Sequence, residues 1–316
     1  MGDAAGIGPE IIVKSVLDTG LRKTVRSVVI GDAAVLNRTL SMIGSDIQVV
    51  EFTNVTTSDN AIEAIDLANL PEQFALGTVS AATGKAAGEC IEKAVELWKS
   101  GTIDAICTAP INKKSLSMGG YDYPGHTEFI AALTDTKEFA MSFFADDLRV
   151  VLLSTHLSLA DAIQKVKSGS LVKLIEFTDR TLAKLLKRDV KIAVAGLNPH
   201  ASENGMFGSE EADEMEPAMA ECREKGIDVS GPYSPDTIFI RGYKGEFDAV
   251  IACYHDQATI AVKCLSFGSA VNVTLGLPLV RTSVDHGTAF DIAGKGVADE
   301  SSMKAAIKLA GELASI

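Results

Sequence analysis

The segment Asp248-Ala249-Val250-Ile251-Ala252-Cys253-Tyr254-His255-Asp256-Gln257 indicates the fold class. Its first half is an apolar run of the length of one buried strand, and an imidazole and a carboxylate follow directly. Open α/β sheets bind ligands at the carboxyl ends of their strands, so His255 and Asp256 stand where a ligand would bind. Asp256, next to a candidate ligand, is also a candidate general base.

Three polar side chains follow this strand at short intervals. They are Lys263, Asn272 and Arg281. A lysine, an amide and an arginine together suit a phosphate or a carboxylate, because both cations donate charge-assisted hydrogen bonds. We count Lys263 with Asp256 among the candidate catalytic residues.

Two more histidines follow apolar runs, in Thr155-His156 and Asn198-Pro199-His200. A single histidine of this kind is most often a satisfied core residue. Three imidazoles at three strand ends favour instead a divalent cation, zinc-like in its ligand preference. His126 differs, because it precedes Thr127 at a predicted helix start. That position suits an anion, although Thr127 could equally cap the helix.

Composition excludes several classes of protein. The 316 residues carry a formal net charge of -13, which argues against nonspecific nucleic-acid binding. No apolar stretch approaches the ~20 residues of a membrane span, and no charged-then-apolar leader opens the sequence. The five cysteines form no Cys-x-x-Cys pair, so we expect them to be reduced. Together these features predict a cytoplasmic protein with no membrane or nucleic-acid partner.

Strand and helix patterns alternate along the chain. Such alternation predicts an α/β fold with a mainly parallel, doubly wound sheet. Asp146-Asp147 joins two apolar runs and predicts one antiparallel hairpin. Residues 53–77 carry little pattern and are expected to form a surface excursion. The expected strands are 28–31, 47–52, 103–107, 139–145, 148–155, 190–196 and 248–252, and the expected helices include 33–43, 79–99, 171–186 and a last one from 301.

The sequence opens with the loop Met1-Gly2-Asp3-Ala4-Ala5-Gly6-Ile7-Gly8-Pro9-Glu10, and Pro9 suits the first turn of a helix. A loop of this kind normally follows a buried strand, and none precedes it here. We therefore expect that upstream residues are missing or that the assigned start is late. The glycines fit an anion cradle at a helix N-terminus and a plain tight turn equally well.

Several of these segments together resemble the 4-hydroxythreonine-4-phosphate dehydrogenase family over essentially the whole chain. The resemblance implies an isocitrate/isopropylmalate-dehydrogenase-like fold of two intimately joined α/β/α domains, NAD as cofactor, and a homodimer that shares a divalent metal (Zn, Mg or Co) between subunits. The segments are residues 2–10, Thr108-Ala109-Pro110-Ile111-Asn112-Lys113, Gly125-His126-Thr127-Glu128-Phe129, Asn198-Pro199-His200-Ala201, Tyr254-His255-Asp256-Gln257 and Asn272-Val273-Thr274-Leu275-Gly276.

The resemblance also implies roles for single residues and a division into domains. The metal ligands would be His156, His200 and His255. The substrate contacts would be His126, Thr127, Lys263, Asn272 and Arg281. The segment 286–296 resembles the adenosine-side NAD loop of isopropylmalate dehydrogenases, with cofactor contacts at His286, Gly287, Asp291, Ile292 and Gly294. One domain would comprise 1–110 with 265–316, and the other, 111–264, would carry the metal and dimer contacts.

The implied reaction is oxidation of the C3 hydroxyl of a 4-phosphorylated four-carbon acid, followed by β-decarboxylation. Ala4, the loop 201–205 and Ala258 depart from the pattern of vitamin B6 enzymes. Ser202, Asn204 and Ala258 favour a sister branch that acts on 4-phospho-D-threonate or 4-phospho-D-erythronate. The alternative substrate is 4-phosphohydroxy-L-threonine, in pyridoxine biosynthesis.

Two other classes of function compete with this one. A metal-dependent hydrolase also uses three histidines, but it leaves the glycine-rich segment 286–296 unexplained. A phosphometabolite-binding protein without turnover leaves the three strand-end histidines unexplained.

Overall fold

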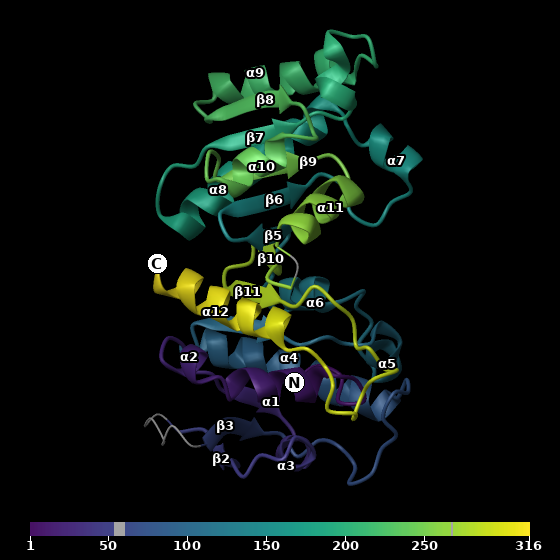
Figure 1. The fold of residues 1–316 in the computed structure, drawn as a ribbon, viewed down its shortest axis with the longest axis vertical. Coiled ribbons are helices and arrows are strands. Elements are labelled where there is room, and N and C mark those ends of the chain that lie inside the picture. Colours follow the sequence, from purple (N-terminus) through teal and green to yellow (C-terminus); the bar gives the residue numbers. More distant parts are fainter. Residues whose placement is uncertain (54–60, 267) are drawn as a thin grey trace. The chain divides into compact units, whose positions relative to one another are not determined.

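A computed structural model of the chain describes residues 1–53, 61–266 and 268–316 (Figure 1). The chain forms two compact units: unit 1 comprises Met1–Lys137 and Leu277–Ser315, and unit 2 comprises Glu138–Gly276. The boundaries from sequence, after residues 110 and 264, lie earlier in the chain. The difference at the first boundary arises because the two helices that follow residue 110 pack within unit 1.

Unit 1 holds a parallel three-stranded sheet and a separate parallel strand pair, with helices around them. The sheet has the order β1-β3-β2, and the pair is β4-β11. Its core is aliphatic and includes Ile11, Leu36 and Ile130, each fully buried. The elements are α1 (Gly8–Val16), α2 (Thr19–Arg22), β1 (Val29–Gly31), α3 (Ala33–Met42), β2 (Gln48–Glu51), β3 (Ala61–Asp66), α4 (Ala81–Lys99), β4 (Ala105–Thr108), α5 (Lys113–Met118), α6 (His126–Leu133), β11 (Val280–Ser283) and α12 (Ser301–Ser315).

Strand β3 corrects the expectation for residues 53–77. It lies in the middle of the three-stranded sheet and buries Ile62 and Ala64. This strand could not be predicted from the sequence because Glu63 interrupts the apolar pattern. Glu63 is buried and accepts hydrogen bonds from Arg26 at 2.7 and 2.8 Å, which offset the cost of burying its charge. Residues 54–60 of the same expectation lie outside the described residues.

Close approach of α5 to α4 depends on two glycines of α4. A Cβ atom at Gly84 would lie 1.7 Å from the carbonyl oxygen of Ser115, and one at Gly88 would lie 2.1 Å from the ring of Tyr121. No side chain fits at either place. The pair of glycines therefore sets how α5 packs, and α5 begins at the end of the β4 loop.

Unit 2 is one six-stranded sheet in the order β10-β5-β6-β9-β7-β8. Its core includes Val150, Ala193 and Val250. The elements are β5 (Ala140–Ala145), β6 (Leu148–Leu152), α7 (Leu159–Gln164), α8 (Ser168–Leu186), β7 (Ile192–Ala195), a 3-10 turn (Pro199–Glu203), a π-helical turn (Glu211–Met215), α9 (Glu216–Glu224), β8 (Val229–Tyr233), α10 (Ile238–Tyr243), β9 (Ala249–Ala252), α11 (His255–Leu265) and β10 (Val271–Leu275).

Strand directions confirm the expected fold class. Strand β5 pairs antiparallel with β6 and β10, whereas β6, β9, β7 and β8 run parallel to one another. The β5–β6 hairpin turns at Asp146 and Asp147, as the sequence predicts. The fold is therefore α/β with mainly parallel strands. Among the helices of the described residues, none has the length and apolar character to cross a membrane.

Candidate active site

A buried cation lies at the paired strands of unit 1. Arg281, on β11, is only 4% exposed, and it donates a 2.7 Å hydrogen bond to the hydroxyl of Thr108 on β4. A second guanidinium nitrogen lies 3.5 Å from the hydroxyl of Thr127 on α6. Burial lowers the pKa of Arg281 to about 10, so the guanidinium keeps its charge at neutral pH.

The N-terminus of α6 adjoins this cation and adds donors. Gly125 precedes the helix and supplies no side-chain cap, so the first N–H groups of α6 have no capping side chain. Burial, reinforced by the charges of Arg281 and the Met1 ammonium, lowers the pKa of His126 well below its ordinary value. His126 is therefore neutral. A cation, hydroxyl groups and a helix N-terminus together form a site for an anion.

Asp3 lies in the opening loop, at the carboxyl end of β4. Its backbone N–H donates to the carbonyl oxygen of Pro110 at 2.9 Å, and its Oδ1 accepts from Ala5 N–H at 3.0 Å. The side chain is fully buried, and Oδ2 has no hydrogen-bond partner among the described residues. Asp3 and Thr108 were not predicted as site residues from the sequence. The only indication of a functional role was that they lie in residues 2–10 and 108–113, two of the segments that carry the family resemblance.

Unit 2 carries the three strand-end histidines. His156 follows β6, His255 follows β9 and His200 follows β7, and these strands are adjacent and parallel in the order β6-β9-β7. The rings of His156 and His255 lie 5.9 Å apart between centroids. His200 does not join them: within the described ranges of the chain, no group of three or more His, Cys, Asp or Glu side chains is close enough to hold a metal ion.

Polar contacts join the ends of these three strands to one another. Ser154, after β6, donates from its hydroxyl to the carbonyl oxygen of Cys253 at 2.9 Å. Gln257 accepts from Cys253 N–H at 2.7 Å and donates to the carbonyl oxygen of Gly196, after β7, at 2.8 Å. Ser154 and Gln257 therefore fix the segments that carry the histidines, a role that their sequence positions alone do not indicate.

His200 lies in a strained turn. It and the next four residues all have positive φ, with values of 53° at His200, 52° at Ala201 and 65° at Ser202. Each non-glycine residue in this conformation costs roughly 1–2 kcal/mol. Asn198 anchors the turn by three hydrogen bonds to Glu210 and Glu211, of 2.7 to 2.9 Å. Strain that is held in place by such contacts is typical of functional segments.

Asp256 accompanies His255 at the start of α11. Its Oδ1 lies 2.7 Å from Nδ1 of His255, and both side chains are accessible to solvent. A carboxylate at Nδ1 holds the imidazole in the tautomer that leaves Nε2 able to bind a metal. The remaining candidates of unit 2 are an exposed Lys263 on α11 and a half-buried Asn272 on β10.

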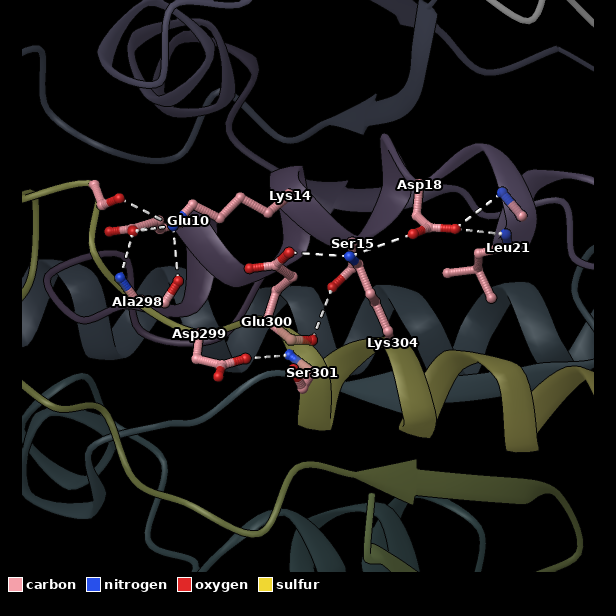
Figure 2. A network of polar contacts seen from close by, with 12 residues as sticks. Glu10, Lys14, Ser15, Asp18, Leu21, Ala298, Asp299, Glu300, Ser301 and Lys304 are labelled. Atoms are coloured by element: carbon pink, nitrogen blue, oxygen red, sulfur yellow. Dashed lines mark hydrogen bonds and ion pairs between the residues drawn. The ribbon is translucent and has the colours of Figure 1, made fainter. Parts of the chain in front are cut away.

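The end of the segment 286–296 and the residues that follow it are held against α1 by a polar network (Figure 2). Lys14 donates from Nζ to Glu10 Oε1 at 2.8 Å, to Gly296 O at 3.0 Å and to Ala298 O at 2.7 Å. The same Glu10 oxygen accepts from Ala298 N–H at 2.7 Å. Farther along, Lys304 pairs with Glu300 and with Asp18. These contacts therefore fix the carboxyl end of the segment 286–296 on α1.

The start of this segment lies on the opening loop. The N–H of Ile7 donates to the carbonyl oxygen of Thr288 at 3.0 Å. His286, Gly287, Asp291 and Gly294 are exposed and Ile292 is half-buried, and a Cβ atom at Gly294 would lie 2.4 Å from Leu76. The structure thus gathers all five predicted cofactor residues on one anchored, solvent-facing loop.

Comparisons with known proteins agree on one family. The family model for the pyridoxal phosphate biosynthetic protein PdxA matches residues 23–310. A putative D-threonate 4-phosphate dehydrogenase from Oceanobacillus iheyensis is 46% identical, over 99% of this chain and 96% of its own length. A D-threonate 4-phosphate dehydrogenase from Cupriavidus necator is also 46% identical, with the same coverage. A crystal structure of a 4-hydroxythreonine-4-phosphate dehydrogenase from Klebsiella pneumoniae is 42% identical over 99% of this chain and 98% of its own, with a TM-score of 0.92.

The fold and these relatives define the protein as an oxidoreductase of the dehydrogenase class. More specifically, the chain belongs to the PdxA family.

Proposed function

We propose that the chain is an NAD-dependent, divalent-metal-dependent dehydrogenase of 4-phospho-D-threonate. It oxidises the C3 hydroxyl, and the resulting β-keto acid loses carbon dioxide. The observation that carries the proposal is the buried Arg281 beside Thr127 and the α6 N-terminus. That arrangement supplies the charge and the donors that a terminal phosphate requires.

The phosphate role follows from electrostatics. A chain of net charge -13 repels a phosphorylated acid in general, so binding needs a local cation. Arg281 stays charged at neutral pH in its buried position, where the attraction to an anion is screened less than in water. His126 is neutral, so it can add a hydrogen bond to the phosphate without adding a charge to the site. Lys263 and Asn272 are proposed to contact the remaining oxygens of the substrate.

The histidines fit a divalent cation by the chemistry of their donors. His156 and His255 are near each other, and Asp256 leaves Nε2 of His255 available. We propose that these two side chains and His200 hold the metal, with at least one of them supplied by the second subunit of a homodimer. A bound cation of this kind would supply Lewis acidity, which lowers the pKa of a substrate hydroxyl.

The anchored loop 286–296 fits the adenosine half of NAD. Its exposed Asp291 carboxylate can accept hydrogen bonds from ribose hydroxyls, and its exposed glycines leave the backbone accessible. We propose that His286, Gly287, Ile292 and Gly294 contact the remainder of that half. NAD would accept the hydride from C3.

The chain's own residues then have four tasks. Arg281, Thr127 and His126 bind and orient the phosphate. Ser154 and Gln257 hold the histidine-bearing strand ends in place. Asp256 orients His255, and it is also our candidate for receiving the hydroxyl proton, directly or through water. Lys263 offsets negative charge on the substrate.

The names of the curated relatives favour the threonate substrate over the amino substrate by a small margin. Among these relatives, those named for D-threonate 4-phosphate are 42–46% identical to this chain, and those named for 4-hydroxythreonine 4-phosphate are 40–43% identical. A solved structure named as a 4-hydroxythreonine-4-phosphate dehydrogenase, from Burkholderia phymatum, is 46% identical. Two of the residues whose identity favoured the threonate branch have roles in the packing and hydrogen bonding of the fold. Ala258 is fully buried in α11, and buried Ser202 accepts a hydrogen bond from Gly205 N–H.

The test is NADH formation from 4-phospho-D-threonate, 4-phospho-D-erythronate and 4-phosphohydroxy-L-threonine, each with Zn²⁺, Mg²⁺ or Co²⁺ and with chelator. We expect 4-phospho-D-threonate to exceed the amino substrate in kcat/KM by about a hundredfold or more, since unmatched polar groups at C2 are strongly rejected. Preference for the amino substrate would make the chain a vitamin B6 biosynthetic enzyme. Tight binding of all three without NADH would support the phosphometabolite-binding alternative.

A further inference from the structure

Lys113, the first residue of α5, lies next to the N-terminus of α6. A Cβ atom at Gly125, the residue that precedes α6, would lie 4.0 Å from Cε of Lys113. The same atom would lie 3.3 Å from Oε2 of Glu128, an acidic residue in the first turn of α6. An ammonium group and a carboxylate therefore flank the space beside Gly125, at the helix end that carries Thr127.

The charges of these two side chains are not engaged elsewhere in the described part of the chain. There, neither the side chain of Lys113 nor that of Glu128 forms a hydrogen bond or an ion pair. An acidic residue at this helix position often accepts a hydrogen bond from the N–H of the residue before the helix, and Glu128 does not. Lys113 is exposed and Glu128 is half-buried. Both charges are therefore available to a ligand.

Packing within unit 1 fixes the backbone of Lys113 relative to α6. The side chain of Asn112 caps α5, because its Oδ1 accepts from the N–H of Ser115 at 2.9 Å. Helices α5 and α6 both pack against α4. In the connection between them, the ring of Tyr123 stacks on that of Phe129 in α6, with centroids 4.3 Å apart. Lys113 thus stays beside the N-terminus of α6 while its long side chain can still reorient.

The charges of the phosphate site proposed above do not balance without Lys113. A phosphate monoester carries about -1.5 to -2 charges at pH 7. Arg281 supplies one positive charge and neutral His126 supplies none. Burial is the main influence on the pKa of Arg281 and lowers it, whereas Cys107 and Glu128 act in the opposite direction. The carboxylate of Glu128 therefore acts on Arg281 and offsets its charge, so a phosphate needs a further cation.

We propose that Lys113 binds the phosphate of the substrate from α5, and that Glu128 competes with the phosphate for Lys113 and Arg281. This inference rests on the proposed function, since it assigns two further residues to the same phosphate site. In the empty site, the carboxylate of Glu128 partly balances the two cations. A bound phosphate has the larger charge and replaces it. Lys113 therefore raises the affinity for phosphate, and Glu128 lowers it.

The first test measures binding of inorganic phosphate by calorimetry, with neither NAD nor metal present. Lys113→Met should raise the Kd about 10- to 100-fold, because a hydrogen bond between two charged groups is lost. Glu128→Gln should lower the Kd about threefold, since an exposed or half-buried charge has a modest effect. Lys114→Met is the matched control, because Lys114 is the next residue of α5 and is also exposed. Its Kd should not change.

A conservative variant separates a binding role from a structural one. Lys113→Arg keeps the positive charge and should restore most of the affinity that Lys113→Met loses. Thermal unfolding of all four variants should give the same Tm as the unaltered chain. Equal Kd values for Lys113→Met and Lys114→Met would overturn the proposal. So would a higher Kd for Glu128→Gln, or an unaltered chain that binds no phosphate.

The second test measures NADH formation and separates this inference from the proposed function. With 4-phospho-D-threonate, Lys113→Met should raise KM and leave kcat nearly unchanged, because the phosphate is not the reacting group. If the unaltered chain forms no NADH but the variants bind phosphate in the expected order, the proposed function fails and the role of Lys113 stands. If NADH forms and Lys113→Met keeps its KM, the proposed function stands and this inference fails.

Discussion

The ammonium group of Lys14 lies 2.7 Å from the carbonyl oxygen of Ala298, a residue 284 positions farther along the chain. This contact, with those of Glu10, joins the first helix to the segment proposed to bind NAD (Figure 2). Lys14 is 19% exposed in its side chain and Glu10 only 3%, so the pair is screened little by solvent. The end of the segment proposed to bind NAD is therefore held by side chains of α1.

Lys14→Met should weaken NAD binding more than substrate binding. Loss of charge-assisted hydrogen bonds worth roughly 1.5 kcal/mol or more frees the end of the loop, and about a tenfold rise in the KM for NAD follows. Hydrogen exchange should increase at 294–298. Lys93→Met, which breaks an exposed pair with Glu96, is the matched control. Equal increases in both KM values would show that the loop serves the fold instead of the cofactor.

Thr127→Val should raise the KM for the phosphorylated substrate, because the hydroxyl near Arg281 is lost as a donor to the phosphate. A hydrogen bond to a charged group contributes about 1.5–3 kcal/mol, so the rise should be about 10- to 100-fold. Thr134→Val changes a hydroxyl at the opposite end of the same helix, where it donates to Ile130 O. That variant should keep its KM. A Thr127→Val enzyme with normal KM would remove the Thr127 hydroxyl from the phosphate site.

Placement of the histidines could be predicted from sequence because each follows an uninterrupted apolar run. Val250 and Ile251 mark β9 clearly, and His255 comes directly after it. Residues that act through backbone groups could not be predicted. Gln257 matters because it reaches Gly196 O, a contact that depends on the strand order β9-β7 and leaves no trace in local pattern.

Two kinds of feature account for the remaining differences. Strand β3 was missed because its pattern contains the charged residue Glu63. A charged residue suggests a surface position, but Glu63 is buried and paired with Arg26. His200 belongs to no group of three metal ligands in the described part of one chain, and the prediction takes at least one of the three histidines from a second subunit, so it stays a prediction. The left-handed turn at His200 could not be predicted either, since nothing in Pro199-His200-Ala201 favours five successive residues of positive φ.

Gly84→Ala and Gly169→Ala should change stability in opposite directions. A methyl group at Gly84 would lie 1.7 Å from Ser115 O, so α5 must shift, at a cost of several kcal/mol in the free energy of unfolding. Gly169, in the first turn of α8, has nothing within 4 Å of the same position. There alanine should stabilise by up to about 1 kcal/mol. Thermal unfolding checks both signs, and an unchanged Tm for Gly84→Ala would contradict the packing of α4 on α5.

Acid should destabilise the folded chain partly through His126. Its pKa is held well below the ordinary 6.5 in the folded state by burial and nearby cations. As the pH falls below about 6.5 the unfolded chain therefore binds a proton that the folded chain does not. The contribution to stability falls by up to about 1.4 kcal/mol per pH unit. His126→Gln should lose this part of the pH dependence. Parallel stability curves for the two proteins between pH 7 and pH 5 would disprove the shift.

Asp256→Asn should weaken metal binding while leaving the fold intact. Asp256 Oδ1 accepts from Nδ1 of His255 in the tautomer that binds metal, and it lies on the surface of α11, where the substitution disturbs no packing. An asparagine can present its amide as a donor instead, which favours the wrong tautomer. Loss of such a partner typically costs 10- to 100-fold in metal affinity.

The metal affinity can be measured without turnover. Metal is first removed from the protein with a chelator, and the protein is then titrated with Co²⁺ and followed by absorption spectroscopy. Asp161→Asn is the control, since Asp161 is a similarly exposed carboxylate that contacts only Ser158 among the hydrogen bonds found for it. His255→Ala should abolish Co²⁺ binding. If Asp256→Asn instead binds Co²⁺ normally and loses only the rate of hydride transfer, Asp256 is the general base and not the group that orients His255.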